Sequence, residues 1–225
     1  MITDPTFDDD VIIRCIRLVA SALPDEWLCV QLRDKRRAPG GLRSFASQLR
    51  QVTRDVGASL VVNGDARIAR DVGADGVHLG SRTLERSERA DPDINARAAG
   101  SVSDARIVCG ARAWISVAAH SDDDVRAAAD GHADAVLVSP VFPTRTVSAG
   151  LLTAKEARGL DALRSARTIS AGRVAVYALG GVTPDNARAC MKAGADGVAM
   201  IRALLQSAQP VRAARALHDA LGADC

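Results

Sequence analysis

The sequence contains few aromatic residues, few lysines and no long apolar run. Aromatic side chains make up 3% of its 225 residues whereas 48% are hydrophobic, so an aliphatic core large enough for one domain is expected. No run of about 18 apolar residues is present, and residues 1–10 are acidic, unlike a secretory leader. We therefore expect a cytoplasmic protein with no membrane partner.

The charges are nearly balanced and well mixed along the chain. Lys and Arg total 29 against 27 Asp and Glu, which leaves a net charge of +2 and no strong field to attract nucleic acid. The five cysteines are an odd number without CxxC spacing, and the four histidines form no HExxH pattern. Neither disulfides nor a zinc site is expected.

Short β-rich runs alternate with helical patterns along the chain. This alternation is typical of parallel strands joined by helices, and it predicts one α/β domain over residues 1–225, a (β/α)8 TIM barrel. An open doubly wound sheet would show the same alternation and remains the alternative fold. The expected strands are Met1–Thr3, Leu28–Leu32, Ser59–Val62, Gly76–Leu79, Arg106–Cys109, Ala135–Val138, Val174–Leu179 and Gly197–Ile201.

Helical periodicity and an internal echo support this division. Apolar residues three and four apart predict one buried stripe on each of the first two helices. The motif Gly-Ala-Asp-Gly-Val occurs at residues 73–77 and 194–198, with a weaker copy at 131–136. Each copy is expected to end a helix with a left-handed residue and to lead into a buried strand. The apolar stripes are Ile12, Cys15, Ile16 and Val19, then Leu42, Phe45, Leu49, Val52 and Val56.

Paired glycines follow the expected seventh strand. Gly180 and Gly181 precede Thr183 and Pro184, a capping hydroxyl followed by proline at the first helical position. Bare amides beside a helix N-terminus favour phosphate binding, and barrels often bind phosphate with the loops after strands 7 and 8. The alternative is a tight turn without a ligand.

Three polar residues alternate at the end of the second expected strand. A period of two predicts that Gln31, Arg33 and Lys35 point the same way, toward the barrel mouth. Such a row suits an anionic group, and we expect Arg33 and Lys35 to act in catalysis. The alternative is a solvated charge cluster, because two further arginines follow.

Further donors are expected around the same mouth. Asn63 closes the third strand, and Thr144 and Thr146 lie in the stretch from residue 139 to 150, which is long enough to form a lid or is simply a proline-containing turn. His78 and His120 end or follow strands, where a histidine either contacts substrate or serves the structure.

These residues occur within a set of motifs that resembles the thiamine phosphate synthase family and its TenI-like relatives, from Ile2 to Leu217. The motifs keep the family's order and spacing. They are Gln31-Leu32-Arg33-Asp34-Lys35, Val62-Asn63, Gly73-Ala74-Asp75-Gly76-Val77-His78-Leu79-Gly80, Pro140-Val141-Phe142-Pro143-Thr144 and Gly180-Gly181.

The resemblance implies a (β/α)8 barrel and a transferase. The family couples hydroxymethylpyrimidine diphosphate to a thiazole phosphate, giving thiamine phosphate and pyrophosphate with Mg2+. Its partners would be these small phosphorylated heterocycles, in a possible homo-oligomer. By resemblance, the pyrimidine diphosphate would be held by Gln31, Arg33, Lys35 and Asn63, and the thiazole phosphate by Thr144, Thr146, Gly181 and the adjoining Gly180.

The chain departs from the family at chemical positions. Gly64 and Thr83 stand where the resemblance implies two magnesium-binding aspartates, Val147 replaces the expected lysine, and Ala118 replaces a serine. Asp65, one residue beyond the first of these positions, is the remaining metal candidate.

Three functions follow as hypotheses. The first is a thiamine phosphate synthase with a displaced ligand such as Asp65. The second is a TenI-like thiazole tautomerase or another metal-independent phosphate-binding enzyme, in which His120 moves the proton, because Pro140 occupies the position of the expected histidine. The third is a regulator that binds a phosphorylated ligand without turnover.

Overall fold

The computed structural model describes residues 1–81, 101–148 and 151–222. Nine strands and nine helices are described in these ranges. The strands are β1 (Cys29–Leu32), β2 (Ser59–Asn63), β3 (Gly76–Leu79), β4 (Trp114–Ala119), β5 (Ala135–Val138), β6 (Thr144–Ser148), β7 (Leu151–Lys155), β8 (Ala175–Leu179) and β9 (Gly197–Ala199). The helices are α1 (Asp9–Ala20), α2 (Pro39–Asp55), α3 (Ala66–Val72), α4 (Val102–Cys109), α5 (Asp122–Asp130), α6 (Asp161–Ser170), α7 (Pro184–Lys192), α8 (Arg202–Leu205) and α9 (Pro210–Gly222).

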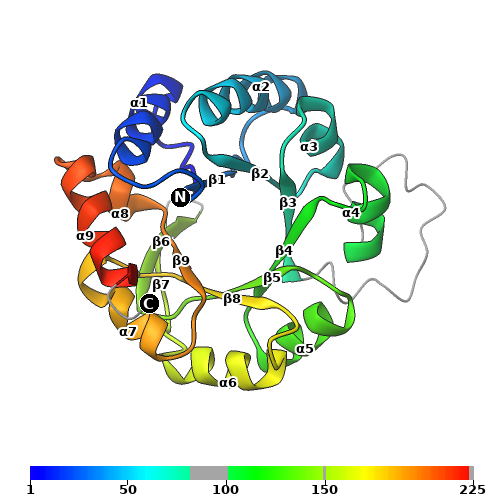
Figure 1. Ribbon diagram of the computed structural model, residues 1–225, viewed down its shortest axis with the longest axis vertical. Coiled ribbons are helices and arrows are strands. Elements are labelled where there is room, and N and C mark those ends of the chain that lie inside the picture. Colours follow the sequence, from blue (N-terminus) through cyan, green and yellow to red (C-terminus); the bar gives the residue numbers. More distant parts are fainter. Residues whose placement is uncertain (82–100, 149–150, 223–225) are drawn as a thin grey trace.

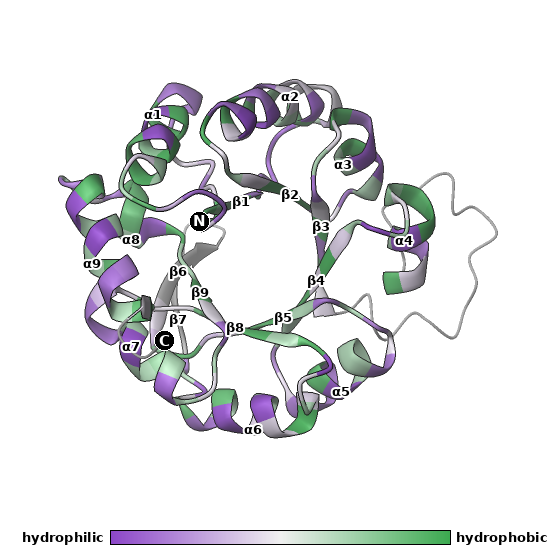
Figure 2. Ribbon diagram, in the orientation of Figure 1, coloured by the Kyte–Doolittle hydropathy of each residue, from purple (hydrophilic) through white to green (hydrophobic). Residues whose placement is uncertain are grey.

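Seven of the strands form one parallel sheet in the order β1-β2-β3-β4-β5-β8-β9. The sheet curls so that its strands surround a central space and the helices lie outside them (Figure 1). In Figure 2 hydrophilic residues are concentrated on this outer layer of helices. Among the described residues, no helix is both long and apolar enough to cross a membrane.

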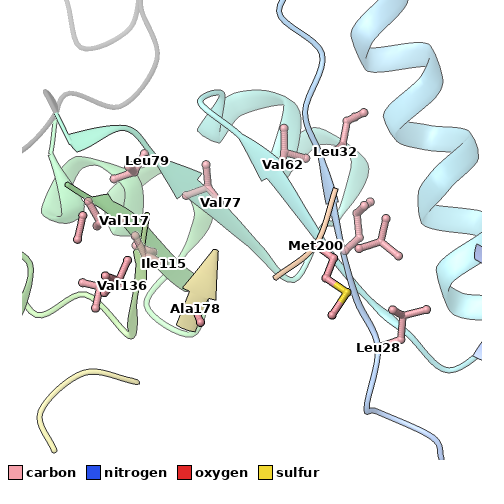
Figure 3. Close-up of a cluster of buried hydrophobic side chains, with 14 of the residues drawn as sticks. Leu28, Leu32, Val62, Val77, Leu79, Ile115, Val117, Val136, Ala178 and Met200 are labelled. Carbon is pink, nitrogen blue, oxygen red and sulfur yellow. The ribbon is translucent and has the colours of Figure 1, made fainter. Parts of the chain in front are cut away.

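The main core lies between the sheet and the helices. Alternate strand residues such as Leu32, Val62, Val77 and Val136 pack there against helix residues (Figure 3). The predicted stripe of α1 is buried, and α2 buries Phe45, Leu49 and Val52 as expected, while Leu42 and Val56 are half-buried at its edge. A smaller cluster of Ile2, Leu137 and Ala199 lies on the inner face of the sheet.

The repeated Gly-Ala-Asp-Gly-Val motif has a structural cause that the sequence did not reveal. The aspartate of each copy accepts a hydrogen bond from a backbone N–H in the neighbouring strand and pairs with an arginine of a helix. The N–H donors to Asp75, Asp134 and Asp196 are Leu60, Ile115 and Val176, at 2.7, 2.6 and 2.8 Å. The arginine partners are Arg50, Arg106 and Arg167, at 2.7, 3.0 and 3.0 Å.

Two of the expected strands differ in the structure. Arg106–Cys109 was predicted as a strand, which is wrong because these residues form the second half of α4. The Oγ of Ser101 accepts the N–H of Asp104 and starts that helix, and 76% of Ile107 is exposed, which a buried strand would not permit. The strand at this point is β4, eight residues on from the start of the predicted one.

The segment Met1–Thr3 is hydrogen-bonded on two sides but forms only an isolated bridge. Ile2 pairs with Gln31 of β1, and the N–H of Ile2 donates to Met200 O at 2.8 Å, beyond β9. It therefore lies between the two edges of the seven-stranded sheet. The stretch predicted as a lid or a turn contains β6, which pairs antiparallel with β7 after the end of that stretch.

Candidate functional site

Strands β1 to β4 bring a row of polar side chains together inside the curled sheet. Gln31 is buried and its Nε2 donates to Asn63 Oδ1 at 3.3 Å. In the next strands, His78 Nδ1 lies 2.9 Å from the Oγ of Ser116, and both side chains are buried. The strand registers place Asn63 beside His78 and His78 beside Ser116, so the row follows the sheet from strand to strand.

His78 is held in its neutral form. Burial, the nearby positive charge of Arg33 and the charge of His120 lower its pKa to about 4. Arg33 and His120 must therefore lie close enough to His78 to act on it electrostatically. The site thus has a fixed cation beside a neutral imidazole that can donate or accept a hydrogen bond at neutral pH.

Arg33 and Lys35 have different settings. The backbone N–H of Arg33 donates to Thr3 Oγ1 at 2.9 Å, just beyond the end of β1. Asp34 then accepts the N–H groups of Arg36 and Arg37, which closes a turn. Lys35 is exposed in that turn, so the strand alternation that predicted its direction does not extend to it.

His120 follows β4 and is exposed at the same end of the sheet. Its Nδ1 lies 2.9 Å from Ser139 O. A carbonyl oxygen only accepts, so Nδ1 carries a hydrogen, and in the neutral form of the ring Nε2 has an available lone pair. The geometry suits a general base.

The paired glycines pack tightly against the stretch that leads into the hairpin. Gly180 and Gly181 have φ values of 96° and 64°. A Cβ on Gly180 would lie 2.7 Å from Pro140, and one on Gly181 would lie 2.7 Å from Phe142 Cβ. This packing requires glycine with or without a phosphate, and it holds the start of β6 beside the glycines.

The phosphate-binding groups predicted near these glycines are partly described. Thr144 begins β6 and is half-buried, whereas only the backbone of Thr146 is described, paired with Thr153. The helix after the glycines, α7, starts with Pro184, and Asn186 Oδ1 accepts the N–H of Thr183 at 2.8 Å. The N-terminal end of α7 therefore follows the glycine pair directly, as predicted.

The residues considered as magnesium ligands are only partly described. In residues 1–81, 101–148 and 151–222, no group of three or more His, Cys, Asp or Glu side chains is placed so that it could hold a metal ion. Asp65 Oδ1 accepts the N–H groups of Arg67 and Ile68, at 3.0 and 2.9 Å, as the N-cap of α3. Thr83 lies outside the described residues. Asp65 thus has a structural role that the sequence did not indicate.

Comparison with known proteins agrees with the fold. Residues 1–204 match the family description "Thiamine monophosphate synthase". The chain belongs to the thiamine monophosphate synthase family. Relatives include the thiamine-phosphate synthase of Methanoculleus marisnigri, 37% identical over 194 residues, which are 86% of this chain and 82% of the relative.

Other members of the family and their structures are also similar. The thiamine-phosphate synthase of Moorella thermoacetica is 32% identical over 204 residues, 91% of this chain and 87% of the relative. A solved thiamine phosphate pyrophosphorylase from Pyrococcus furiosus superposes with a TM-score of 0.74 at 25% identity, covering 99% of this chain and 94% of that chain.

Two site residues were not predicted: Ser116 because the fifth strand was misplaced, and Ser139 because its contact with His120 joins the ends of two different strands. Ser116 lies in the middle of β4 and Ser139 follows β5, where its carbonyl orients His120. The signal for Ser116 was the run Trp114–Ala119, apolar and β-branched, placed before the capped start of α5 at Ser121.

Proposed function

We propose that this member of the family is a transferase that couples hydroxymethylpyrimidine diphosphate to a thiazole phosphate and releases pyrophosphate. The observation that carries the proposal is the polar row of Gln31, Asn63, His78 and Ser116 on neighbouring strands, with Arg33 directly after the end of β1. Relatives named as thiamine-phosphate synthases support the substrate class.

The reaction needs charge to be managed at two atoms. As the carbon–oxygen bond of the pyrimidine diphosphate breaks, positive charge grows on the methylene carbon and negative charge on the departing pyrophosphate. Arg33 and Lys35 would stabilise the pyrophosphate, and Gln31 with Asn63 would orient the pyrimidine. Because His78 is neutral, it places no positive charge near the methylene carbon while positive charge develops on that carbon.

The attacking thiazole would be held on the opposite side of the mouth. Its phosphate would lie against the amides of Gly180 and Gly181 at the N-terminal end of α7, with the hydroxyls of Thr144 and Thr146 as donors. The thiazole nitrogen would then attack the methylene carbon, forming the carbon–nitrogen bond as pyrophosphate leaves.

In this proposal Mg2+ would be bound mainly by the diphosphate of the substrate. Mg2+ commonly keeps several waters and binds through one or two carboxylates together with substrate phosphates. Since no group of three or more His, Cys, Asp or Glu side chains in the described residues is placed to hold a metal ion, we derive no step through a protein-bound metal.

We further propose that the protein is cytoplasmic and that Met1–Thr3 acts as the eighth strand of a closed (β/α)8 barrel. The hydrogen bonds from Ile2 N to Met200 O at 2.8 Å and from Thr3 N to Gln31 O at 2.9 Å, one toward each edge of the sheet, support closure. Closure would complete the ring of strand ends around the substrate.

The direct test supplies purified protein with both substrates and Mg2+. Thiamine phosphate, read by fluorescence after oxidation to the thiochrome, is the expected product. If no product forms at high enzyme concentration but calorimetry still shows binding of thiazole phosphate or pyrophosphate, the transferase proposal is wrong. The protein would then be a ligand-binding regulator.

The orientation of His120 favours a second candidate, a TenI-like thiazole tautomerase. Its Nε2 is free to remove a proton because Nδ1 donates to Ser139 O. Tautomerase activity that persists with chelator and falls at least ~100-fold in His120→Gln would support this function. An unchanged rate in the variant would exclude His120 as the proton carrier.

A further inference from the structure

A cavity of about 380 Å3 lies inside the curled sheet and reaches from the amino ends of the strands to Gln31 and Ser116 of the polar row. Its wall includes Cys29, Ser59 and Trp114, which are the first residues of β1, β2 and β4. The cavity extends outward to α9, where Leu217 and His218 line it. Arg33, Asn63, His120 and Gly180 are not among its lining residues.

The cavity is where the rare aromatic residues of this chain gather. The sequence contains two tryptophans and one tyrosine, and all three, Trp27, Trp114 and Tyr177, line it. Trp114 and Tyr177 meet edge to face with ring centroids 6.1 Å apart, and the rings of Trp27 and His218 lie tilted at 55° with centroids 4.4 Å apart. Ring faces and edges on two sides of one space are suited to a flat ligand.

The ring of Tyr177 depends on a glycine beside it. A Cβ on Gly197 would lie 2.6 Å from Tyr177 Cε1, so no larger residue fits there without moving the ring. Cys29 is exposed although β1 pairs with β2 on one side and with Met1–Thr3 on the other. Its side chain therefore borders open space on the inner face of the sheet.

The charges around the cavity favour a cation. No lysine or arginine side chain is among the described residues that line it, whereas Glu26 and Asp75 are. Asp75 is paired with Arg50, but Glu26 has no such partner in the described part of the chain. The α-amino group of Met1 donates to Cys29 O, and burial lowers its pKa, which reduces its positive charge.

We propose that this cavity binds a planar, positively charged heteroaromatic molecule without a phosphate. Aromatic faces attract cations, and the carboxylate of Glu26 adds to that attraction, whereas a phosphate would meet no arginine or lysine among the described lining residues. The cavity adjoins the site assigned to the phosphorylated substrates, with which it shares Gln31 and Ser116, but its binding of a cation does not rest on the proposed reaction.

Calorimetric titration with three bicyclic probes of similar size tests the charge. The probes are N-methylquinolinium, naphthalene and naphthalene-2-carboxylate. We expect the cation to bind at least roughly tenfold more tightly than the anion, with the neutral probe between them. Equal affinities, or no binding of the cation at millimolar concentration, would overturn the proposal.

Variants test the location. Cys29→Phe should fill the cavity and abolish binding of N-methylquinolinium, whereas Ile107→Phe, on an exposed position of α4, should leave it unchanged. Tyr177→Leu, which removes a ring without filling the space, should weaken binding roughly tenfold. Circular dichroism and thermal melting show whether each variant is folded.

Fluorescence of variants with a single tryptophan gives an independent test of where the probe binds. Trp27→Phe and Trp114→Phe each leave one indole on the cavity wall, and the fluorescence of both should saturate at the calorimetric affinity. Retained binding in a folded Cys29→Phe protein, or a fluorescence change that never saturates, would place the probe elsewhere and overturn the proposal.

Discussion

His78 Nδ1 lies 2.9 Å from the Oγ of Ser116, and both residues are buried on adjacent strands of the curled sheet. The pair lies in a polar row with Asn63 and Gln31 on neighbouring strands. Because its pKa is lowered to about 4, His78 stays neutral at physiological pH. Several measurable consequences follow from this arrangement and from the contacts around it.

The pH dependence of stability should show the lowered pKa of His78. An unfolded histidine has a pKa near 6.5, so between about pH 6.5 and 4 the unfolded chain takes up a proton that the folded chain does not. Stability falls as pH falls through this window, by on the order of 3 kcal/mol at most. His78→Asn removes the titration and should flatten this part of the curve.

Urea unfolding at pH 7, 5.5 and 4.5 measures this effect. His132→Asn is the matched control, because His132 is exposed with a φ of 58°, which asparagine tolerates. Parallel pH profiles for wild type and His78→Asn would show that His78 titrates normally.

Arg33→Ala should lower kcat/KM by roughly tenfold to a hundredfold, because the departing pyrophosphate loses a charged partner. The same change should raise the pKa of His78, since the charge of Arg33 contributes to lowering it. Steady-state kinetics and an NMR titration of the imidazole measure the two effects. Arg36→Ala, on an exposed residue of the same turn, is the control and should change neither.

Gly181→Ala should destabilise the protein by about 2 to 4 kcal/mol, because it adds a positive-φ cost to a clash with Phe142. Gly172→Ala isolates the first cost, since Gly172 has a φ of 76° and no atom within 4 Å of the added Cβ. It should lose about 1 kcal/mol. Equal losses of stability in the two variants, measured by denaturant unfolding, would show that Phe142 moves aside for the added methyl group.

Asp65→Asn should retain both stability and turnover, because asparagine caps a helix as well as aspartate does. Asp65→Ala should lose about 1 kcal/mol of stability with the cap of α3. Thermal melting and activity at saturating Mg2+ compare the two variants. A requirement for more Mg2+ in Asp65→Asn would instead identify Asp65 as a metal ligand.

Asp134→Ala should cost about 1 to 3 kcal/mol because it leaves the N–H of Ile115 without its acceptor. Asp134→Asn keeps an acceptor oxygen and should cost less, losing mainly the ion pair with Arg106. Hydrogen exchange of the Ile115 amide should accelerate in the alanine variant alone. Similar exchange in both variants would assign the stabilisation to the ion pair.

Alternation and periodicity in the sequence were enough to predict the α/β class and most of the strands. The apolar stripe of α1 and the runs at 59–62, 76–79 and 135–138 specify their own burial, because each places its hydrophobic side chains at the spacing of one element. The tight turn at the Gly180–Gly181 pair and the capped start of α7 were also predictable from the local sequence. These features depend on residues close together in the chain.

Relationships across strands were decided only by the tertiary structure. Nothing local says that Asp75 accepts from Leu60, that Ser116 meets His78, or that Asp65 is used as a helix cap. The misplaced strand at Arg106–Cys109 has the same origin, because a short apolar run fits a strand or an amphipathic helix until its neighbours bury one face. Likewise, the gathering of Trp27, Trp114 and Tyr177 at one cavity depends on how the sheet curls, which no single segment encodes.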